Sequence, residues 1–331
     1  MDASALQSNW RWLAGHAGVA AGAAIKADGY GLGDRPVCDS LLQAGCRDFF
    51  VSTWAEAEAL GPLPEGAQLV VLHGIGPDDA EAPRARPCLN SAEQIARWKQ
   101  VAPDRPCDVM IDTGMNRLGL RPEDAALLDG LAIDTLHSHL ACADEDHALN
   151  ATQLDRFRAI AAAVPAKRYS LANSAGICLG RDYSFDLVRP GLSLYGGVPR
   201  REAQGHIRQV ARVETQIVQR RTIRRGESCG YGATFIADQD TAAAILNIGY
   251  ADGYLRGFSE RGIAFAGEVA LPVIGRVSMD LIAVDCGAAK ELNAGDWVEI
   301  GYDLPTAAAQ SGLSQYELLT TLGDRFERRW V

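Results

Sequence analysis

The sequence predicts an α/β protein in which an N-terminal (β/α)8 barrel, residues 1–208, is followed by a C-terminal mainly-β domain, residues 209–331. At 331 residues the chain is longer than one hydrophobic core usually supports, so two domains are expected. Short apolar runs first alternate with helix-like stretches, which is typical of βα units around a parallel sheet. After about residue 208 the long helix-like stretches cease, and Gly-rich turns separate the apolar runs.

The barrel is predicted because eight strands can be placed one by one. They are expected at residues 20–25, 49–52, 69–72, 87–89, 109–111, 135–138, 168–171 and 187–188. Two of the intervening helices carry start signals, since Thr53 with Glu56 and Ser91 with Gln94 have the spacing of a capping box. Eight strand and helix repeats are the number that closes a parallel sheet into a barrel.

The mainly-β domain is predicted from five further apolar runs. They lie at residues 214–223, 242–248, 268–274, 281–285 and 297–300. Short runs of this kind, bounded by Gly-rich turns, are typical of antiparallel strands.

Composition and charge narrow the class of partner. Hydrophobic residues make up 47% and charged residues 22%, as in ordinary globular proteins, and the net charge of −10 would repel nucleic acids and anionic membranes. A small molecule is therefore the expected partner.

The longest apolar stretches, such as residues 17–25, are too short to cross a bilayer, and the N-terminus has no signal-peptide pattern, so a cytoplasmic protein is expected. The eight cysteines and six histidines show no metal-ligand spacing, so neither a metal site nor disulfides are expected.

Polar residues follow several of the predicted barrel strands directly. They are Lys26, the segment 112–117, His139, Asn173 with Ser174, and Arg189. Sites in such barrels form where the C-terminal strand ends meet, so these residues are expected to converge. A lysine desolvated there can lose its proton and condense with an aldehyde, although a solvated surface lysine is the commoner explanation of one lysine alone.

Eight motifs carry a resemblance to a known family. Residues 23–33 read AAIKADGYGLG, and DTGMNRLGL, HSHLACADE, NSAGI, RPGLSLYGG, GYGATF, GYADGY and GRVSMD follow in this order. The first resembles the pyridoxal-5'-phosphate (PLP) lysine segment of bacterial alanine racemases, and the others recur in that family in the same order. The resemblance runs from about residue 5 to the C-terminus.

The resemblance implies a PLP enzyme that interconverts L-alanine and D-alanine, supplying D-alanine for peptidoglycan. Lys26 would bind PLP covalently and act as one catalytic base. Tyr231 would be the other base and would reach the site from the opposite subunit of a homodimer. The remaining cofactor-binding residues implied are Tyr30, His139, Asn173, Ser174, Arg189, Gly191, Leu192 and Tyr316.

Further roles are implied around the substrate. Arg117 would contact the phenolic oxygen of PLP and the substrate carboxylate. Arg189 would face the pyridine nitrogen, and His139 would connect Arg189 to Tyr231. The substrate entrance would be lined from the partner subunit by Met279, Asp280 and Tyr250.

These roles are chemically coherent. Racemisation needs a base on each face of the substrate carbon, so that a proton removed from one side can be returned from the other. A phenol needs nearby positive charge to act as a base, which the pair of Arg189 and His139 could supply to Tyr231. A guanidinium has no proton to give up at neutral pH, so Arg189 would leave the pyridine nitrogen unprotonated and suppress transamination.

One position departs from the family. Many alanine racemases have a carbamylated lysine where this chain has Met110, and its negative charge orients the arginine that corresponds to Arg117. Met110 cannot be carbamylated, so a chloride ion held near Asn116 and Arg117 is expected to replace that charge. The alternative is that Asn116 only serves a turn and a carboxylate or water orients Arg117.

Three other functions are compatible with parts of the sequence pattern. A racemase of the same fold could act on serine, lysine or several amino acids, and pocket width would decide between them. A non-catalytic PLP-binding barrel would lack the β domain that carries Tyr231, Met279 and Asp280. PLP-dependent decarboxylases of basic amino acids share the two-domain plan but not this ordered set of motifs.

Overall fold

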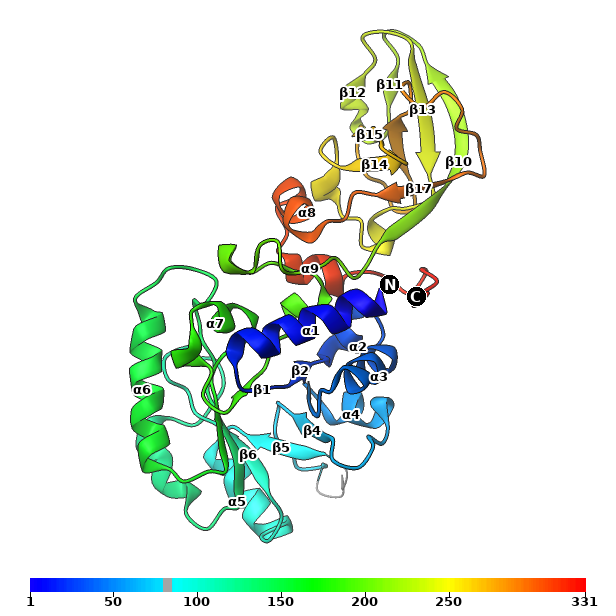
Figure 1. Cartoon of the computed structure of the whole chain (residues 1–331). Coiled ribbons are helices and arrows are strands. Elements are labelled where there is room, and N and C mark those ends of the chain that lie inside the picture. The colour runs from blue at the N-terminus through cyan, green and yellow to red at the C-terminus, as the bar shows by residue number, and fades with distance from the viewer. Residues whose placement is uncertain (80–84) are drawn as a thin grey trace. The chain divides into compact units, whose positions relative to one another are not determined.

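The computed structural model describes residues 1–79 and 85–331. The chain forms two compact units, one of residues 3–208 and one of residues 209–331 together with Met1–Asp2 (Figure 1). Both termini belong to the second unit, since Asp2 N donates to Val210 O at 2.9 Å and Val331 N donates to Met1 O at 2.9 Å.

The first unit is a parallel barrel made of a curled seven-stranded sheet and a two-stranded pair. Seven strands pair in chain order, namely β2 (Ala23–Ala24), β3 (Asp48–Val51), β4 (Gln68–Val71), β5 (Arg86–Leu89), β6 (Cys107–Met110), β7 (Ile133–His137) and β8 (Arg168–Ser170). The eighth strand, β9 (Leu187–Val188), pairs with β1 (Ala20–Ala21). Asp186 N, just before β9, donates to Tyr169 O in β8, and Arg189 N, just after β9, donates to Ala172 O beyond the end of β8. The predicted barrel is therefore confirmed.

Gly22 explains why the expected first strand is divided. It separates β1 from β2, and its N–H donates to Val188 O at 2.9 Å across the barrel seam. A Cβ at this residue would lie 2.7 Å from the Asp48 carbonyl oxygen and from Phe50. Only glycine allows the backbones to approach so closely.

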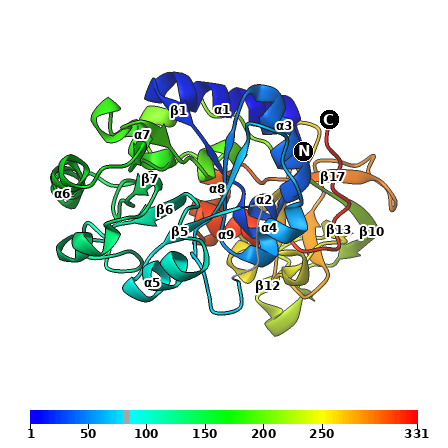
Figure 2. The same ribbon diagram turned by 90° about the horizontal axis from the view of Figure 1, so that it is seen from below.

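Helices cover the outside of this barrel, and α5 and α6 can be followed there in Figure 2. The helical segments of this unit are α1 (Ala3–Ala17), α2 (Lys26–Gly31), α3 (Asp34–Ala44), α4 (Trp54–Leu60), α5 (Ala92–Val101), α6 (Leu149–Ala163) and α7 (Ser174–Cys178). Of these, α2 is a left-handed turn at the end of β2 and not a covering helix. Thr53 and Glu56 form the expected capping box on α4. On α5 the expectation is half right, because Ser91 accepts from Gln94 N whereas the Gln94 side chain accepts from Asn90 N instead of Ser91 N.

The second unit contains a closed barrel of six antiparallel strands, which confirms the mainly-β prediction. Their order is β10 (Val213–Ile223), β13 (Thr241–Leu246), β16 (Ile282–Asp285), β15 (Val269–Ile274), β14 (Ile263–Ala266) and β17 (Trp297–Ile300). A hairpin of β11 (Ser228–Cys229) and β12 (Phe235–Ile236) and two helices, α8 (Leu304–Ser311) and α9 (Gln315–Thr320), complete it. The strand β14 and these two helices were not predicted.

Short 3-10 turns connect the elements of both units. They are η1 (Pro122–Leu128), η2 (Arg181–Tyr183), η3 (Leu192–Tyr195), η4 (Arg201–Ala203), η5 (Tyr231–Ala233), η6 (Tyr250–Asp252) and η7 (Arg256–Phe258). Within the described ranges, no helix is both long and apolar enough to cross a membrane.

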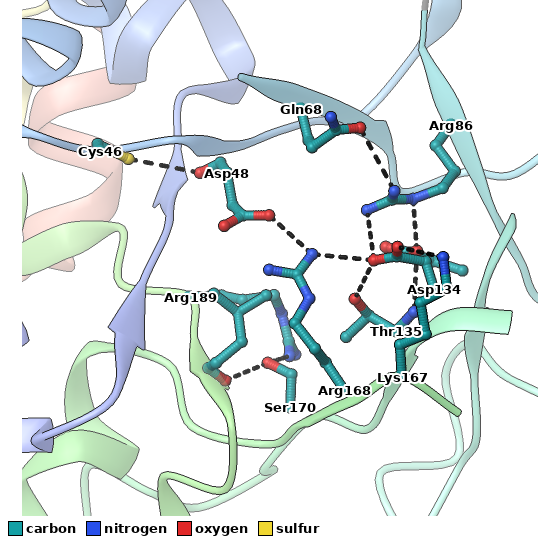
Figure 3. A network of polar contacts seen from close by, with 12 residues as sticks. Cys46, Asp48, Gln68, Arg86, Asp134, Thr135, Lys167, Arg168, Ser170 and Arg189 are labelled. Carbon is teal, nitrogen blue, oxygen red and sulfur yellow. Dashed lines mark hydrogen bonds and ion pairs between the residues drawn. The ribbon is translucent and has the colours of Figure 1, made fainter. Parts of the chain in front are cut away.

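The interior of the first barrel has a charged floor and an apolar middle. At the N-terminal strand ends, Arg168 bridges Asp48 at 2.8 Å and Asp134 at 3.0 Å (Figure 3). Above them lies an apolar cluster of Phe50, Val70, Cys88, Met110 and Leu187. The C-terminal strand ends above this cluster lead into Lys26, the segment 112–117, His139, Asn173 with Ser174, and Arg189.

Candidate active site

A left-handed turn presents Lys26 at the end of β2. The next four residues, Ala27 to Tyr30, have φ between 52° and 58°, a conformation that costs a non-glycine residue about 1–2 kcal/mol. Hydrogen bonds hold the turn, since Gly29 N donates to Ile25 O at 2.9 Å and Ala27 N donates to the Glu56 carboxylate at 2.9 Å. Strain of this kind persists where the surroundings fix the backbone, which is common at functional sites.

The surroundings of Lys26 favour its neutral amine. Burial lowers the pKa of Lys26, the positive charge of Arg117 lowers it further, and Glu56 raises it. A neutral amine is the nucleophilic form, so this lysine is suited to covalent attachment of an aldehyde.

A small cradle lies between the ends of the first and last barrel strands. The Tyr30 ring is buried and stacks on Tyr195, with ring centroids 4.6 Å apart. A Cβ at Gly191 would lie 2.3 Å from the Tyr30 hydroxyl oxygen, so the backbone and the phenol are in close contact. Ser174 Oγ accepts from Gly191 N at 3.0 Å and from Ser193 N at 3.2 Å. The structure thus brings together Tyr30, Ser174 and Gly191, with Leu192 next in the chain.

The cradle fits a phosphate group. Ser174 uses its oxygen as an acceptor for two N–H groups, which leaves its hydroxyl hydrogen to donate to an anion. The Ser193 hydroxyl is buried without a hydrogen-bond partner among the described residues, and such a group normally has one. Asn173 has a structural role beside the cradle, because its side chain accepts from Gly176 N at 2.8 Å at the start of α7.

Arg189 is buried and fixed by contacts on one edge of its guanidinium. NH1 contacts the Ser170 hydroxyl and donates to His137 Nδ1 at 3.0 Å, and NH2 donates to Ser138 O at 2.6 Å. The Nε–H and one NH2 hydrogen have no acceptor among the described residues, so they can meet a ligand. Burial lowers the pKa of Arg189 to about 10, which leaves it charged at neutral pH.

Arg189 contacts His137, a histidine that was not among the expected site residues. No hydrogen bond joins Arg189 to His139 in the part of the chain that the structure describes, whereas His137 accepts one. Burial and the positive charges of Arg189, Arg117 and Lys26 lower the pKa of His139 to about 3. His139 therefore lies within electrostatic reach of all three of these side chains.

Arg117 lies on an exposed loop after β6. Asp112 shapes the loop by accepting from Gly114 N at 2.8 Å and Met115 N at 2.9 Å. Asn116 has φ of 55°, as expected for a turn residue, and within the described residues neither its amide nor the Arg117 guanidinium makes a side-chain hydrogen bond or ion pair. Met110, at the position of the family's lysine, packs in the apolar middle of the barrel.

The expected residues of the second unit lie in loops of the β barrel, except Tyr316, which lies on α9. Tyr231 follows Gly230 and is 67% exposed, and Met279 is 52% exposed. Tyr250 lies beside Met279, because Tyr250 N donates to Ser278 O and Ala251 N donates to Met279 O. Asp280 pairs with Arg325 at 2.7 Å. Tyr316, on α9, is 42% exposed.

Two residues of the barrel site were missed in the sequence. His137 is fully buried between Arg189 and Asp108, and Asp108 lies at 2.8 Å from its Nε2. The signal that identifies His137 is the strand period, since it stands two residues before His139 and so faces the same side.

Among the described residues, no group of His, Cys, Asp and Glu could hold a metal ion.

Comparisons with known proteins point to one family. The model described as "Alanine racemase, N-terminal domain" matches residues 1–199, and that described as "Alanine racemase, C-terminal domain" matches residues 210–330. A catabolic alanine racemase of Agrobacterium fabrum is 43% identical, over 100% of this chain and 91% of its own length. An alanine racemase of Dinoroseobacter shibae is 41% identical, over 100% of this chain and 97% of its own length.

Solved structures agree with the sequence relatives. The alanine racemase of Bartonella henselae with covalently bound pyridoxal phosphate superposes with a TM-score of 0.92 at 35% identity, over 100% of this chain and 98% of that one. The biosynthetic alanine racemase of Pseudomonas aeruginosa gives a TM-score of 0.91 at 31% identity, also over 100% and 98%.

Proposed function

This chain belongs to the alanine racemase family, and from that premise we propose that it interconverts L-alanine and D-alanine by moving the α-proton between Lys26 and Tyr231. The family makes the protein a PLP-dependent isomerase. The observation that supports the proposal best is the position of Lys26 on its left-handed turn, within the same barrel mouth as the phosphate-sized cradle and Arg189.

Each residue of the barrel mouth has a proposed task. Lys26 Nζ holds PLP covalently and takes or returns the α-proton on one face of the substrate. Tyr30, Ser174 and the backbone of Gly191 and Leu192 hold the phosphate, with Asn173 placing Ser174 at the start of α7. When bound, PLP supplies the electron sink that takes up the electron pair left when the α-proton is removed.

Arg189 sets the reaction type in this proposal. Its unpartnered N–H groups are available to donate to the pyridine nitrogen, and a guanidinium charged at neutral pH cannot protonate that nitrogen. Lys26 or Tyr231 would then return the proton to the substrate carbon, and the amino group would stay on the substrate. His139 is proposed to lie between Arg189 and the second base as a neutral hydrogen-bonding group.

We propose that Tyr231 acts on the opposite face and reaches the site from the second subunit of a homodimer. Its phenol is 67% exposed on a loop of the β barrel, which makes it available to a second subunit. Tyr250, Met279 and Asp280 lie on loops of the same unit and are proposed to line the substrate entrance with it. Tyr316 is proposed to complete the phosphate contacts.

A chloride ion is proposed to orient Arg117. The guanidinium is exposed and without a side-chain partner among the described residues, and Met110 supplies no charge. Replacing chloride by a bulky anion at equal ionic strength should raise KM for alanine, and restored chloride should reverse the change. Unchanged kinetics would favour the alternative in which Asn116 serves only the turn.

The proposed cellular role is the supply of D-alanine for peptidoglycan in the cytoplasm. A relative named catabolic and a neighbour named biosynthetic support the two possible roles. Deleting the gene distinguishes them, because loss of a biosynthetic racemase makes growth depend on added D-alanine. Loss of a catabolic one instead impairs growth on alanine as carbon source.

The activity is tested by incubating the purified protein and PLP with single L-amino acids and separating the enantiomers by chiral chromatography. We expect D-alanine to form fastest. Faster conversion of serine or lysine would favour the broader racemase, and no conversion of any amino acid would contradict the proposed function.

A further inference from the structure

His137 connects the buried charges of the barrel to Arg189. It ends β7, is fully buried, and packs edge-on against Phe50 with ring centroids 5.8 Å apart. Its Nε2 lies 2.8 Å from Asp108 Oδ2, and its Nδ1 lies 3.0 Å from Arg189 NH1. The three side chains therefore form a continuous chain of hydrogen bonds from carboxylate to imidazole to guanidinium.

The partners of His137 select one tautomer. A guanidinium can only donate hydrogen bonds, so the Nδ1 atom that faces Arg189 must carry the lone pair. The proton of the neutral ring is then on Nε2, where it donates to Asp108. Burial and the charge of Arg189 lower the pKa of His137 to about 4, against the opposing effect of Asp108, so the ring stays neutral at physiological pH.

Asp108 is itself held from the opposite side. Its Oδ1 lies 2.7 Å from Arg86 Nε and accepts from Thr135 N at 3.2 Å. Arg86 continues to Asp134 at 3.0 Å, and Asp134 meets Arg168 in the charged floor of the barrel (Figure 3). These neighbours fix the Asp108 carboxylate, and they also satisfy its charge in a site where an unpaired carboxylate would be costly.

We infer that His137 is a positioning residue for Arg189, holding its NH1 edge so that Nε and the free NH2 hydrogen face the cofactor. The inference rests on the proposed function, in which those donors meet the pyridine nitrogen. The two NH1 hydrogens of Arg189 are donated to His137 Nδ1 and Ser170 Oγ. One of its NH2 hydrogens is donated to Ser138 O. A guanidinium held at three points has one orientation, whereas loss of the imidazole acceptor leaves it free to rotate.

The test uses two amide substitutions in the full-length, PLP-loaded protein. His137→Asn places an amide oxygen near the position of Nδ1 and so keeps an acceptor for Arg189. His137→Gln places its amide near the position of Nε2, which keeps a donor for Asp108 and removes the acceptor for Arg189. His16→Gln, on the exposed part of α1, is the matched control.

We expect His137→Gln to lower kcat for alanine by about 10- to 100-fold, the cost of a misplaced group in an active site. KM should change little, because Arg189 is proposed to contact the cofactor and not the substrate. Pyruvate and pyridoxamine 5'-phosphate should accumulate in equal amounts, since the amino group of alanine passes to the cofactor when Arg189 no longer suppresses transamination. His137→Asn and His16→Gln should stay near the parental rate without these products.

Three results would overturn the inference. One is an equal loss of activity in His137→Asn and His137→Gln, which would make the role of His137 merely structural. Another is parental kcat and no pyridoxamine 5'-phosphate in His137→Gln. Nitrogen-15 NMR of the His137 ring gives a readout without catalysis, and a protonated Nδ1 would also overturn it. If the unsubstituted protein does not racemise alanine, the proposed function is contradicted. The NMR result still decides whether His137 accepts a hydrogen bond from Arg189.

Discussion

Replacing Gly191 by alanine should weaken PLP binding while the barrel stays folded. The added Cβ would lie 2.3 Å from the Tyr30 hydroxyl oxygen, and Cβ atoms essentially never approach another heavy atom within 3.0 Å. The hydroxyl must therefore move by at least 0.7 Å, the difference between 3.0 and 2.3. The Tyr30 ring cannot turn aside freely, because it is buried and stacked on Tyr195.

The size of the effect follows from the cost of overpacking, about 1–3 kcal/mol. If the whole cost falls on the PLP-bound state, Kd rises roughly 5- to 150-fold, since about 1.4 kcal/mol corresponds to tenfold. The assay is a fluorescence titration of the cofactor-free protein with PLP. Gly15→Ala is the control, because residue 15 lies on α1 with no atom within 4 Å of the added Cβ. It should leave Kd unchanged and stabilise the helix by about 0.5–1 kcal/mol.

The same substitution in a Tyr30→Phe protein tests the contact between the added Cβ and the Tyr30 hydroxyl. Tyr30→Phe removes the oxygen that the Cβ would meet first, so Gly191→Ala should raise Kd less in that background than in the parental protein. An unchanged Kd in the single variant, or the same increase in both backgrounds, would refute the explanation.

Four further outcomes are expected. Borohydride should abolish the yellow absorption of the PLP-loaded protein and fix the cofactor on Lys26; peptide mass spectrometry that finds it on another lysine would contradict the assignment. Tyr231→Phe should impair proton abstraction from L-alanine, and Lys26→Ala should impair proton abstraction from D-alanine. Parental rates in both directions for Tyr231→Phe would exclude a two-base reaction. Mixing these two inactive proteins should restore activity through one intact site per heterodimer, and its absence after verified subunit exchange would count against a shared site. Finally, the pKa of His137 is lowered from 6.5 to about 4 in the fold, so the unfolded chain takes up a proton that the folded chain does not as the pH falls from 6.5 towards 4. Between pH 7 and pH 5.5 the free energy of unfolding should therefore fall by about 1 kcal/mol more in the parental protein than in His137→Gln. Urea titration of the cofactor-free forms at the two pH values measures this difference. Equal decreases in the two proteins would contradict a neutral His137 in the folded state.

The barrel strands were predictable because parallel strands buried on both faces leave continuous apolar runs. The run at residues 20–25 also shows the limit of this signal, since Gly22 divides it only because Asp48 and Phe50 approach from the neighbouring strand. The strand β14 was missed for a related reason. Its sequence Ile-Ala-Phe-Ala is short and mixed, and it is a strand because its neighbours β15 and β17 pair with it.

The site residues also fall into a group that the sequence predicts and a group that it does not. Lys26, Arg189 and Ser174 follow apolar runs directly, so the sequence places them at the strand ends. His137 and Asp108 lie within strands and read as ordinary strand positions. Their contact depends on the pairing of β6 with β7, and a sequence pattern contains no information on which buried polar groups satisfy each other.

In the left-handed turn after Lys26, exposed residues are expected to tolerate few substitutions. Ala27 and Asp28 are exposed, so by accessibility alone they would accept almost any side chain. Their φ values of 53° and 52° instead admit glycine and asparagine readily and disfavour valine and isoleucine, whose branched Cβ clashes with the backbone there. Variation among natural sequences at these two surface positions should therefore be limited by backbone conformation, and a mutational scan would find intolerant sites that touch neither substrate nor core.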